Sequence, residues 1–210
     1  MPKPRKLSEL NLSKEYLASL MDFSVLHPDA KQEDIDHGIE IAKQYRFKGF
    51  HTNTFWAPYV AEKLDGTGIE AGWPVAYPFG CVSTALKVAE AKEGATMLKG
   101  KPWVIDMVAN HGKLRSGDYN FYRNDIAEVA KVAHDNGIEC KVILEAQFLT
   151  DDELKTAVEL SCEAGVDWVK SSTGRHGGPQ FHQVQIMCET AAEGVKVKIA
   201  GTGSFWTPMI

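Results

Sequence analysis

The segment Trp168–Gly174, with the sequence WVKSSTG, is an apolar strand pattern that carries a lysine and runs into a turn of small residues. Such a run followed by turn residues predicts a short buried strand. A lysine there needs a reason, because an ammonium group removed from water loses its solvation. A larger share of the amine is then neutral, and the neutral amine attacks carbonyl carbon. Lys170 is therefore a Schiff-base candidate.

Strand patterns of this kind alternate with amphipathic helix patterns along the whole chain. The predicted strands are residues 21–26, 48–53, 73–78, 103–108, 140–146, 168–173 and 196–201. The predicted helices are residues 32–45, 83–97, 120–136, 150–164 and 181–193. Thr150 and Glu153 form a capping-box pattern, and Gly137 and Gly165 stand where helix ends favour a positive φ. The alternation predicts repeated βα units around a parallel sheet.

Charged residues in the later strands favour a closed barrel over an open sheet. They are Asp106, Glu145, Lys170 and Lys198, each within or near the C-terminal half of a strand. Strands covered on both faces should be almost wholly apolar, whereas a (β/α)8 barrel can point such residues into its C-terminal mouth. No GxGxxG or Walker A motif follows the early strands. We expect one α/β domain over residues 1–210, a TIM (β/α)8 barrel, with residues 1–20 as an N-terminal extension or helix.

Composition excludes several classes of partner. The 210 residues carry a formal net charge of -5, and the pI is near 5.8. An acidic chain is a poor match for nucleic acid or an anionic membrane, so a small-molecule ligand fits better. No apolar segment follows the basic N-terminus and no run reaches membrane-spanning length, which predicts a cytoplasmic protein. The four cysteines, Cys81, Cys140, Cys162 and Cys188, lack a CxxC pair and are expected to be free thiols.

Several motifs recur in a distinctive order. They are Ile105–Val108 (IDMV), Gly112–Tyr119 (GKLRSGDY), Lys141–Glu145 (KVILE), Val169–Gly174 (VKSSTG) and Gly177 with Gly178. Earlier pieces are Asp22, Leu26–Ala30 (LHPDA), Asn53 ahead of Pro58, Tyr77–Gly80 (YPFG), Lys87 and Glu90–Lys92 (EAK). Together these segments resemble the deoxyribose-phosphate aldolase family. The likeness runs from about Met21 to Gly201, nearly the whole chain.

The resemblance implies a class I aldolase that needs no metal or other cofactor. Such an enzyme joins acetaldehyde and glyceraldehyde 3-phosphate into 2-deoxyribose 5-phosphate, and reverses the reaction. The family's Schiff-base lysine falls on Lys170, its second lysine on Lys198 and its acid/base aspartate on Asp106. The expected substrate- and phosphate-binding residues are Asp22, Asn53, Ser172, Thr173, Gly174, Gly201 and Thr202.

Elementary chemistry supports the three catalytic roles. An ammonium on Lys198 would repel a second positive charge and so favour the neutral amine on Lys170. Once an iminium forms, its nitrogen is the electron sink, and Asp106 could relay a proton through water. The amides of the turn after Lys170, with Gly177 and Gly178, can hold a phosphate.

Structural alternatives stand beside these roles. A lysine near a strand end often reaches solvent, which we expect for Lys141 and Lys196 at the openings of their strands. Asp106 alone could be a hydrogen-bonded structural carboxylate, and Lys198 could have a structural or surface role. Glu145 either supports the site from behind or joins a salt bridge. Asp22 either orients groups in the pocket or bonds the barrel wall.

Four histidines offer a different chemistry. Each of them falls at or just after the C-terminal end of a strand: His27, His51, His111 and His176. Together they could bind a divalent metal ion, which would activate a carbonyl in place of an iminium. No HxH or HExxH spacing supports this alternative, so we favour a polar lining. Compared with typical members of the family that the sequence resembles, His27 replaces a lysine, His51 a cysteine and Arg175 a phenylalanine. The substrate can therefore differ from that of typical members, while the reaction class stays the same.

The C-terminal end departs most from the family pattern. Thr202 and Ser204 stand where a glycine and an arginine are usual, and an eighth strand has no counterpart in the sequence. Three outcomes remain open: the chain is a piece of a longer protein, a partner or residues 7–20 fill the gap, or the barrel closes with seven strands. The apolar ending 205–210 suits a subunit boundary, and we expect a homodimer or a higher homo-oligomer.

Two other functions also remain open. One is a degenerate family member that binds a sugar phosphate or a protein partner without turnover. The other keeps the lysine chemistry and changes the substrate, as in a thiolase-like or different aldolase reaction.

Overall fold

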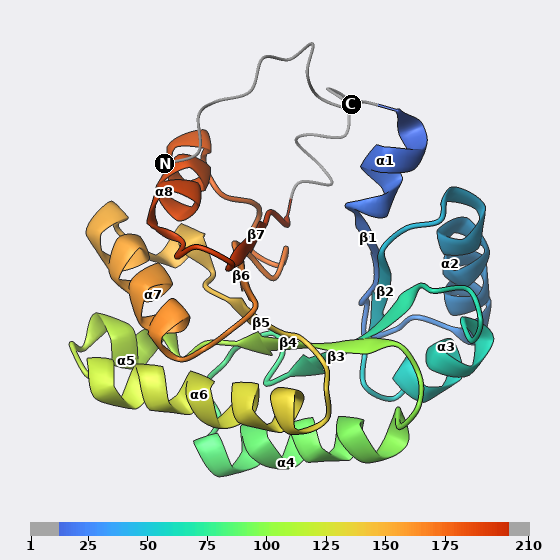
Figure 1. Cartoon of the computed structure of the whole chain (residues 1–210), viewed down its shortest axis with the longest axis horizontal. Helices are drawn as coiled ribbons and strands as arrows, with labels where there is room; N and C mark the ends of the chain where they lie inside the picture. The colour runs from blue at the N-terminus through green and yellow to red at the C-terminus, as the bar shows by residue number, and fades with distance from the viewer. Residues whose placement is uncertain (1–12, 202–210) are drawn as a thin grey trace. The chain divides into compact units, whose positions relative to one another are not determined.

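The computed structural model describes residues 13–201 (Figure 1). The chain divides into two compact units. The N-terminal unit contains the chain up to Trp73 together with 97–103, and the C-terminal unit contains 74–96 and the chain from Val104 onward. The expectation of a single domain, with residues 1–20 as an extension, stays a prediction. Thr202 and the apolar ending 205–210 lie outside the described residues.

The N-terminal unit is built on parallel strands. Its elements are α1 (Lys14–Ser19), β1 (Asp22–Val25), α2 (Gln32–Tyr45), β2 (Gly49–Thr52), α3 (Ala57–Lys63) and the first part of β3 (Glu70–Val75). β2 pairs in parallel with β1 and with β3. Helix α2 buries Ile35, Gly38, Ile39 and Ala42, one helical stripe. Gly38 lies so close to the Phe50 ring of β2 that an added Cβ would be 2.7 Å from it, and only glycine allows this approach.

The C-terminal unit repeats strand and helix. Its elements are α4 (Thr84–Met97), β4 (Trp103–Val108), α5 (His111–Arg115), α6 (Tyr119–Asp135), β5 (Cys140–Ile143), the 3-10 turn η2 (Ala146–Phe148), α7 (Asp151–Glu163), β6 (Trp168–Lys170), α8 (Phe181–Thr190) and β7 (Lys196–Lys198). β4 to β7 pair in parallel in chain order. Figure 1 shows α5 to α8 on one side of these strands. The parallel pairing places the strands' C-terminal ends along one edge.

Most predicted elements are present, with differences at their ends. α2 and β4 have the predicted bounds, and the predicted capping box at Thr150 begins α7. β3 begins at Glu70 and not at Trp73 as predicted. β5, β6 and β7 end earlier than predicted, because the chain leaves the ladder to form the loops at the strands' C-terminal ends. The short helices α1, α3 and α5 carry too few turns for a periodic signal.

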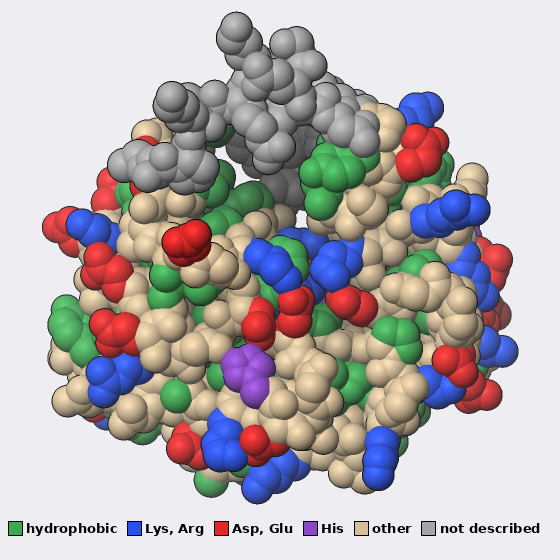
Figure 2. All heavy atoms as spheres, viewed as in Figure 1, with side chains coloured by type: hydrophobic (Ala, Val, Ile, Leu, Met, Phe, Trp, Pro, Cys, Tyr) green, Lys and Arg blue, Asp and Glu red, His purple; other side chains and the backbone are tan. Residues whose placement is uncertain are grey.

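The structure also bears on the predictions about the cysteines, the number of strands and the surface charge. All four cysteines are free thiols, which confirms the prediction. Within residues 13–201 the structure has seven strands and no eighth. No helix in this range is long and apolar enough to cross a membrane. Figure 2 shows acidic and basic side chains intermixed on the visible face.

A buried ion pair joins α4 to α6 within the C-terminal unit. Lys87 and Asp125 have fully buried side chains, and Lys87 Nζ lies 2.6 Å from Asp125 Oδ2. Lys87 also donates to the carbonyl of Val108 at 3.0 Å, and Thr84 donates to Asp125 Oδ1 at 2.7 Å. Burial lowers the pKa of Lys87, while the charge of Asp125 opposes this shift.

We expect Lys87→Met to lower the free energy of unfolding by about 3–5 kcal/mol, because it leaves Asp125 buried without its cation. The double variant Lys87→Met/Asp125→Leu should regain most of this loss, since no buried charge remains. Urea unfolding measures both, with Lys92→Met on the exposed face of α4 as the control. Equal stability of Lys87→Met and Lys92→Met would contradict the prediction.

Candidate active site

Lys170 and Asp106 meet in the C-terminal unit. Asp106 lies on β4 and Lys170 ends β6, with β5 between them. Lys170 Nζ is 2.5 Å from Asp106 Oδ2, and the two side chains are 13% and 5% exposed. The backbone of Lys170 is held on both sides, because Leu144 N donates to its carbonyl and Ser171 N donates to the carbonyl of Lys198. The amine therefore stands on a rigid element, beside a carboxylate that can exchange protons with it.

Lys198 is the backbone partner of Lys170 on β7. Its Nζ lies 5.9 Å from the centre of the Trp168 ring, and the ammonium groups of Lys141 and Lys196 lie 5.6 Å and 4.5 Å from the same ring. Trp168 Nε1 donates to Glu139 Oε2 at 2.6 Å, which holds the ring in place. An aromatic face attracts cations, which accounts for the three lysines around this ring. Lys198 thus stands on the strand next to Lys170, near the Trp168 ring.

Lys141 does not reach solvent, so the prediction for this residue is wrong. Its side chain is completely buried, and Nζ is 4.0 Å from Asp106 Oδ1. The in-register pairing of Lys141 with Asp106 and the face of Trp168 explain the burial, because together they offer an anion and an aromatic ring. These partners lie on neighbouring strands, so the local sequence around Lys141 could not reveal its burial. Lys196 is half exposed, as predicted, and pairs with Glu139.

The turn after β6 brings several predicted binding residues together. Ser172 Oγ donates to Gln147 Oε1 at 3.0 Å. Gly174 has a φ of 83°, which favours glycine, and its backbone lies close to that of Gly201. A Cβ added to Gly201 would lie 2.1 Å from the Gly177 carbonyl oxygen, so only glycine fits there. The turn is therefore closed by contacts between glycine backbones.

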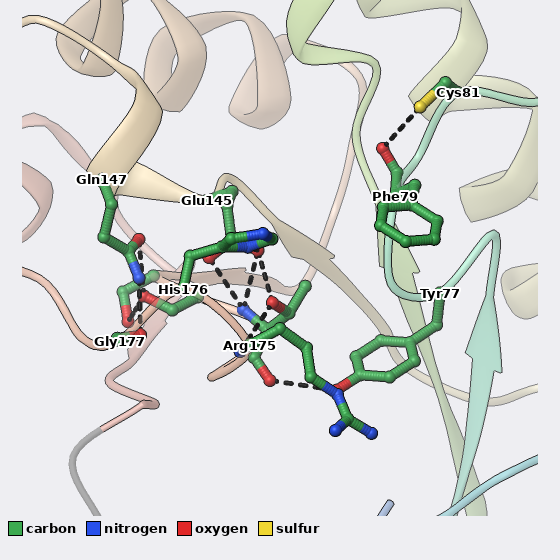
Figure 3. A network of polar contacts seen from close by, with 11 residues as sticks. Tyr77, Phe79, Cys81, Glu145, Gln147, Arg175, His176 and Gly177 are labelled. Atoms are coloured by element: carbon green, nitrogen blue, oxygen red, sulfur yellow. Dashed lines mark hydrogen bonds and ion pairs between the residues drawn. The ribbon is translucent and has the colours of Figure 1, made fainter. Parts of the chain in front are cut away.

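Glu145 supports this turn from behind, one of its two predicted roles. Its side chain is buried, and its carboxylate accepts hydrogen bonds from Thr173 N at 3.2 and 3.3 Å and from Thr173 Oγ1 at 2.5 Å. His176 Nδ1 lies 3.8 Å from the same carboxylate. Figure 3 shows Glu145 and His176 side by side. Glu145 thus holds the turn through Thr173, and His176 lies close to the same carboxylate.

Asp22 and Asn53 belong to the N-terminal unit. Asp22 Oδ2 lies 3.3 Å from His51 Nε2, with both side chains largely buried. Asn53 Nδ2 donates to the carbonyl oxygen of His27 at 3.2 Å. Their assignment to substrate binding stays a prediction, and Thr202 lies outside the described residues.

The remaining histidines of the metal alternative pack against an aromatic ring. His111 and His176 lie 5.9 Å and 4.7 Å from Phe148, measured between ring centres. Within residues 13–201, no three histidine, cysteine or acidic side chains are arranged to hold a metal ion. His111 meets this ring edge-on and His176 lies tilted against it, so both histidines have aromatic contacts.

His111 should make stability depend on pH. Burial lowers its pKa from the ordinary 6.5 to about 4, and the charges of Lys87 and His176 act in the same direction. The unfolded chain therefore binds the proton more readily between these values. The contribution of neutral His111 to the free energy of unfolding is therefore fully present above pH 6.5 and is lost as the pH falls toward 4.

A difference of one pKa unit corresponds to about 1.36 kcal/mol, so protonation of His111 should lower the free energy of unfolding by on the order of 3 kcal/mol. We expect His111→Phe, which keeps a ring against Phe148, to flatten the pH dependence by about that amount. Urea unfolding of both proteins at several pH values between about 7.5 and 4 measures this. Parallel pH curves for the parent and the variant would contradict it.

Similarity to known proteins agrees with this geometry. No protein-family model matches the chain. Over 186 residues it is 39% identical to deoxyribose-phosphate aldolase of Bacillus cytotoxicus, covering 88% of this chain and 82% of that protein. It is 37% identical to deoxyribose-phosphate aldolase of Mycoplasmopsis pulmonis over the same shares. The chain belongs to the deoxyribose-phosphate aldolase family.

The fold of the chain is also similar to that of solved structures from this family. The deoxyribose-phosphate aldolase of Aeropyrum pernix has a TM-score of 0.80 and 28% identity, covering 90% of this chain and 79% of that chain. The prediction of a TIM (β/α)8 barrel, with no eighth strand among residues 13–201, is confirmed.

Proposed function

We propose that this deoxyribose-phosphate aldolase family member cleaves 2-deoxy-D-ribose 5-phosphate reversibly into glyceraldehyde 3-phosphate and acetaldehyde. The reaction proceeds through a Schiff base on Lys170. The observation that carries the proposal is the contact of Lys170 Nζ with Asp106 Oδ2 at 2.5 Å on two buried strands. The names of the curated relatives support the choice of substrate.

Lys170 begins the reaction after passing a proton to Asp106. Its neutral amine adds to the C1 aldehyde of the sugar, and loss of water leaves an iminium. A base takes the proton of the C3 hydroxyl, the C2–C3 bond breaks, and its electron pair moves into the iminium to give an enamine. Glyceraldehyde 3-phosphate leaves with C3 as its aldehyde. Protonation of the enamine at C2 and hydrolysis release acetaldehyde and restore the amine.

Asp106 is proposed as the group that moves these protons. It lies within hydrogen-bond reach of Lys170, which is the first requirement for a general acid or base. Lys141 stands near its other oxygen, so the carboxylate has a cation on each side. Lys198, on the neighbouring strand, is proposed to repel a second positive charge on Lys170 and so favour the reactive neutral amine.

The turn of Ser172, Thr173 and Gly174, with Gly201, is proposed as part of the phosphate site. The glycine backbones of Gly174 and Gly201 approach each other closely, and backbone amides in turns of this kind can hold an anion. From the sequence resemblance we also propose Thr202, Asp22 and Asn53 as substrate-binding residues.

Two measurements test the function. Sodium borohydride with acetaldehyde should trap a stable adduct on Lys170, identified by peptide mass mapping. Cleavage of 2-deoxyribose 5-phosphate should exceed cleavage of 2-deoxyribose. No adduct on Lys170 would overturn the Schiff-base mechanism and favour binding without turnover. Equal rates for the two sugars would overturn the phosphate site alone.

We also propose a cytoplasmic homo-oligomer, a dimer or larger. The Aeropyrum pernix relative is described as tetrameric, and the free cysteines of this chain suit a reducing compartment. Phe55 and Phe181 are 81% and 71% exposed, which is consistent with apolar contacts between subunits. Light scattering at micromolar concentration tests this, and a stable monomer would overturn it.

A further inference from the structure

Two strand ends in the C-terminal unit have an unusual backbone. Among the described residues of this unit, Ala76 and Glu145 have a left-handed φ without being glycine, at 55° and 47°. Ala76 follows β3 and Glu145 follows β5. Ala76 N donates to Glu90 Oε2 of α4 at 2.6 Å, which helps to hold this conformation. Such strain persists only where the surrounding structure enforces it, and it often marks a functional site.

Residues at both strand ends form hydrogen bonds with Thr173. Tyr77, directly after Ala76, donates from its hydroxyl to the carbonyl oxygen of Thr173 at 3.1 Å. Glu145 accepts from the amide and the hydroxyl of Thr173. Every polar group of Thr173 is thus bonded to one of these two residues. Figure 3 shows the ring of Tyr77 directed toward Arg175, with Glu145 beside His176.

Arg175 adds to the contact between Tyr77 and the turn. Its guanidinium lies 5.9 Å from the centre of the Tyr77 ring, and its backbone N donates to Thr173 Oγ1 at 3.2 Å. Burial raises the pKa of Tyr77, although the charge of Arg175 opposes the shift. The phenol therefore keeps its proton at neutral pH and remains a hydrogen-bond donor.

We propose that Tyr77 is a positioning residue for substrate binding, holding Thr173 from one side while Glu145 holds it from the other. The inference rests on the proposed function. Thr173 is the middle residue of the Ser172–Gly174 turn, and the turn follows Lys170 on β6. The Tyr77 hydroxyl bonds to the backbone carbonyl of Thr173 within this turn, near the Arg175 side chain. It therefore acts on the shape of the binding turn, and the aldol chemistry continues without it.

Tyr77→Phe tests this role, because it removes the hydroxyl and keeps the ring under Arg175. We expect KM for 2-deoxyribose 5-phosphate to rise about three- to tenfold, as for the loss of one neutral hydrogen bond. kcat should stay within about twofold, since uniform binding is lost and not transition-state stabilisation. Tyr119→Phe, at an exposed position on α6, is the matched control and should change neither value. Glu145→Gln should raise KM in the same way.

Two further measurements separate this proposal from the proposed function. Borohydride should still trap Lys170 in Tyr77→Phe, and amide hydrogens of 172–178 should exchange faster than in the parent. If the parent gives no adduct, the proposed function fails. The dissociation constant for 2-deoxyribose 5-phosphate then replaces KM, and it should rise in Tyr77→Phe. An unchanged KM or dissociation constant overturns the positioning role, and so does a fall in kcat at constant KM.

Discussion

Replacing Lys170 with alanine should lower kcat/KM for cleavage of 2-deoxyribose 5-phosphate by a factor on the order of 10⁴ or more. The amine is the proposed nucleophile, and no other group can replace the covalent step that it provides. Lys170→Arg should lose as much activity, although it keeps a positive charge beside Asp106. A guanidinium remains protonated and does not form the imine. The comparison separates the nucleophile from the ion pair with Asp106.

Steady-state kinetics and borohydride trapping measure this effect together. Lys131→Ala is the control, because its side chain is exposed on α6 and pairs with Asp135. It should keep parental turnover and parental trapping on Lys170. Thermal unfolding must show that both Lys170 variants are folded. Turnover near the parental rate in folded Lys170→Ala would rule out the Schiff-base mechanism.

Asp106→Asn should lower kcat by about 10²- to 10⁴-fold, the range expected for loss of a general acid or base. Asparagine has nearly the same shape, so the change removes the charge and the proton transfer with little change in packing. Lys170 should still be trapped, more slowly, because Asp106 no longer accepts its proton. The effect should therefore fall on proton transfer and not on the identity of the nucleophile.

Exchange of the methyl protons of acetaldehyde with deuterium in D₂O measures this step directly. NMR should show slower exchange for Asp106→Asn than for the parent. Asp135→Asn, at an exposed position on α6, should exchange at the parental rate. If Asp106→Asn exchanged protons as fast as the parent, another group would be the acid/base.

Much of the fold follows from local sequence patterns. The stripe of apolar residues in α2, the apolar run of β4 and the capping box at Thr150 are each set by neighbours within a few residues. The ends of β5 to β7 could not be read in this way. There the local composition does not change sharply where the chain leaves the ladder, and hydrogen bonding to the next strand decides where pairing stops.

The sequence likewise identified some residues of the candidate site and missed the surroundings of others. Lys170 was identifiable as a charged residue in an apolar strand, and Asp106 by its place in a motif shared with the aldolase family. The burial of Lys141 was not identifiable, because it depends on Asp106 and Trp168 on neighbouring strands. A lysine's local sequence says nothing about which anion will lie opposite to it.

The sequence by itself determined the alternation of strands and helices, the family and the amine of Lys170. Short-range periodicity and the identity of reactive groups are properties of the chain. Only the tertiary structure decided that Asp106 contacts Lys170 and that Tyr77 and Glu145 hold Thr173. These contacts join residues 28 to 96 positions apart, and parallel strand register brings such residues together. The reactive amine on β6 is thus a feature of the sequence, and its surroundings are a product of the fold.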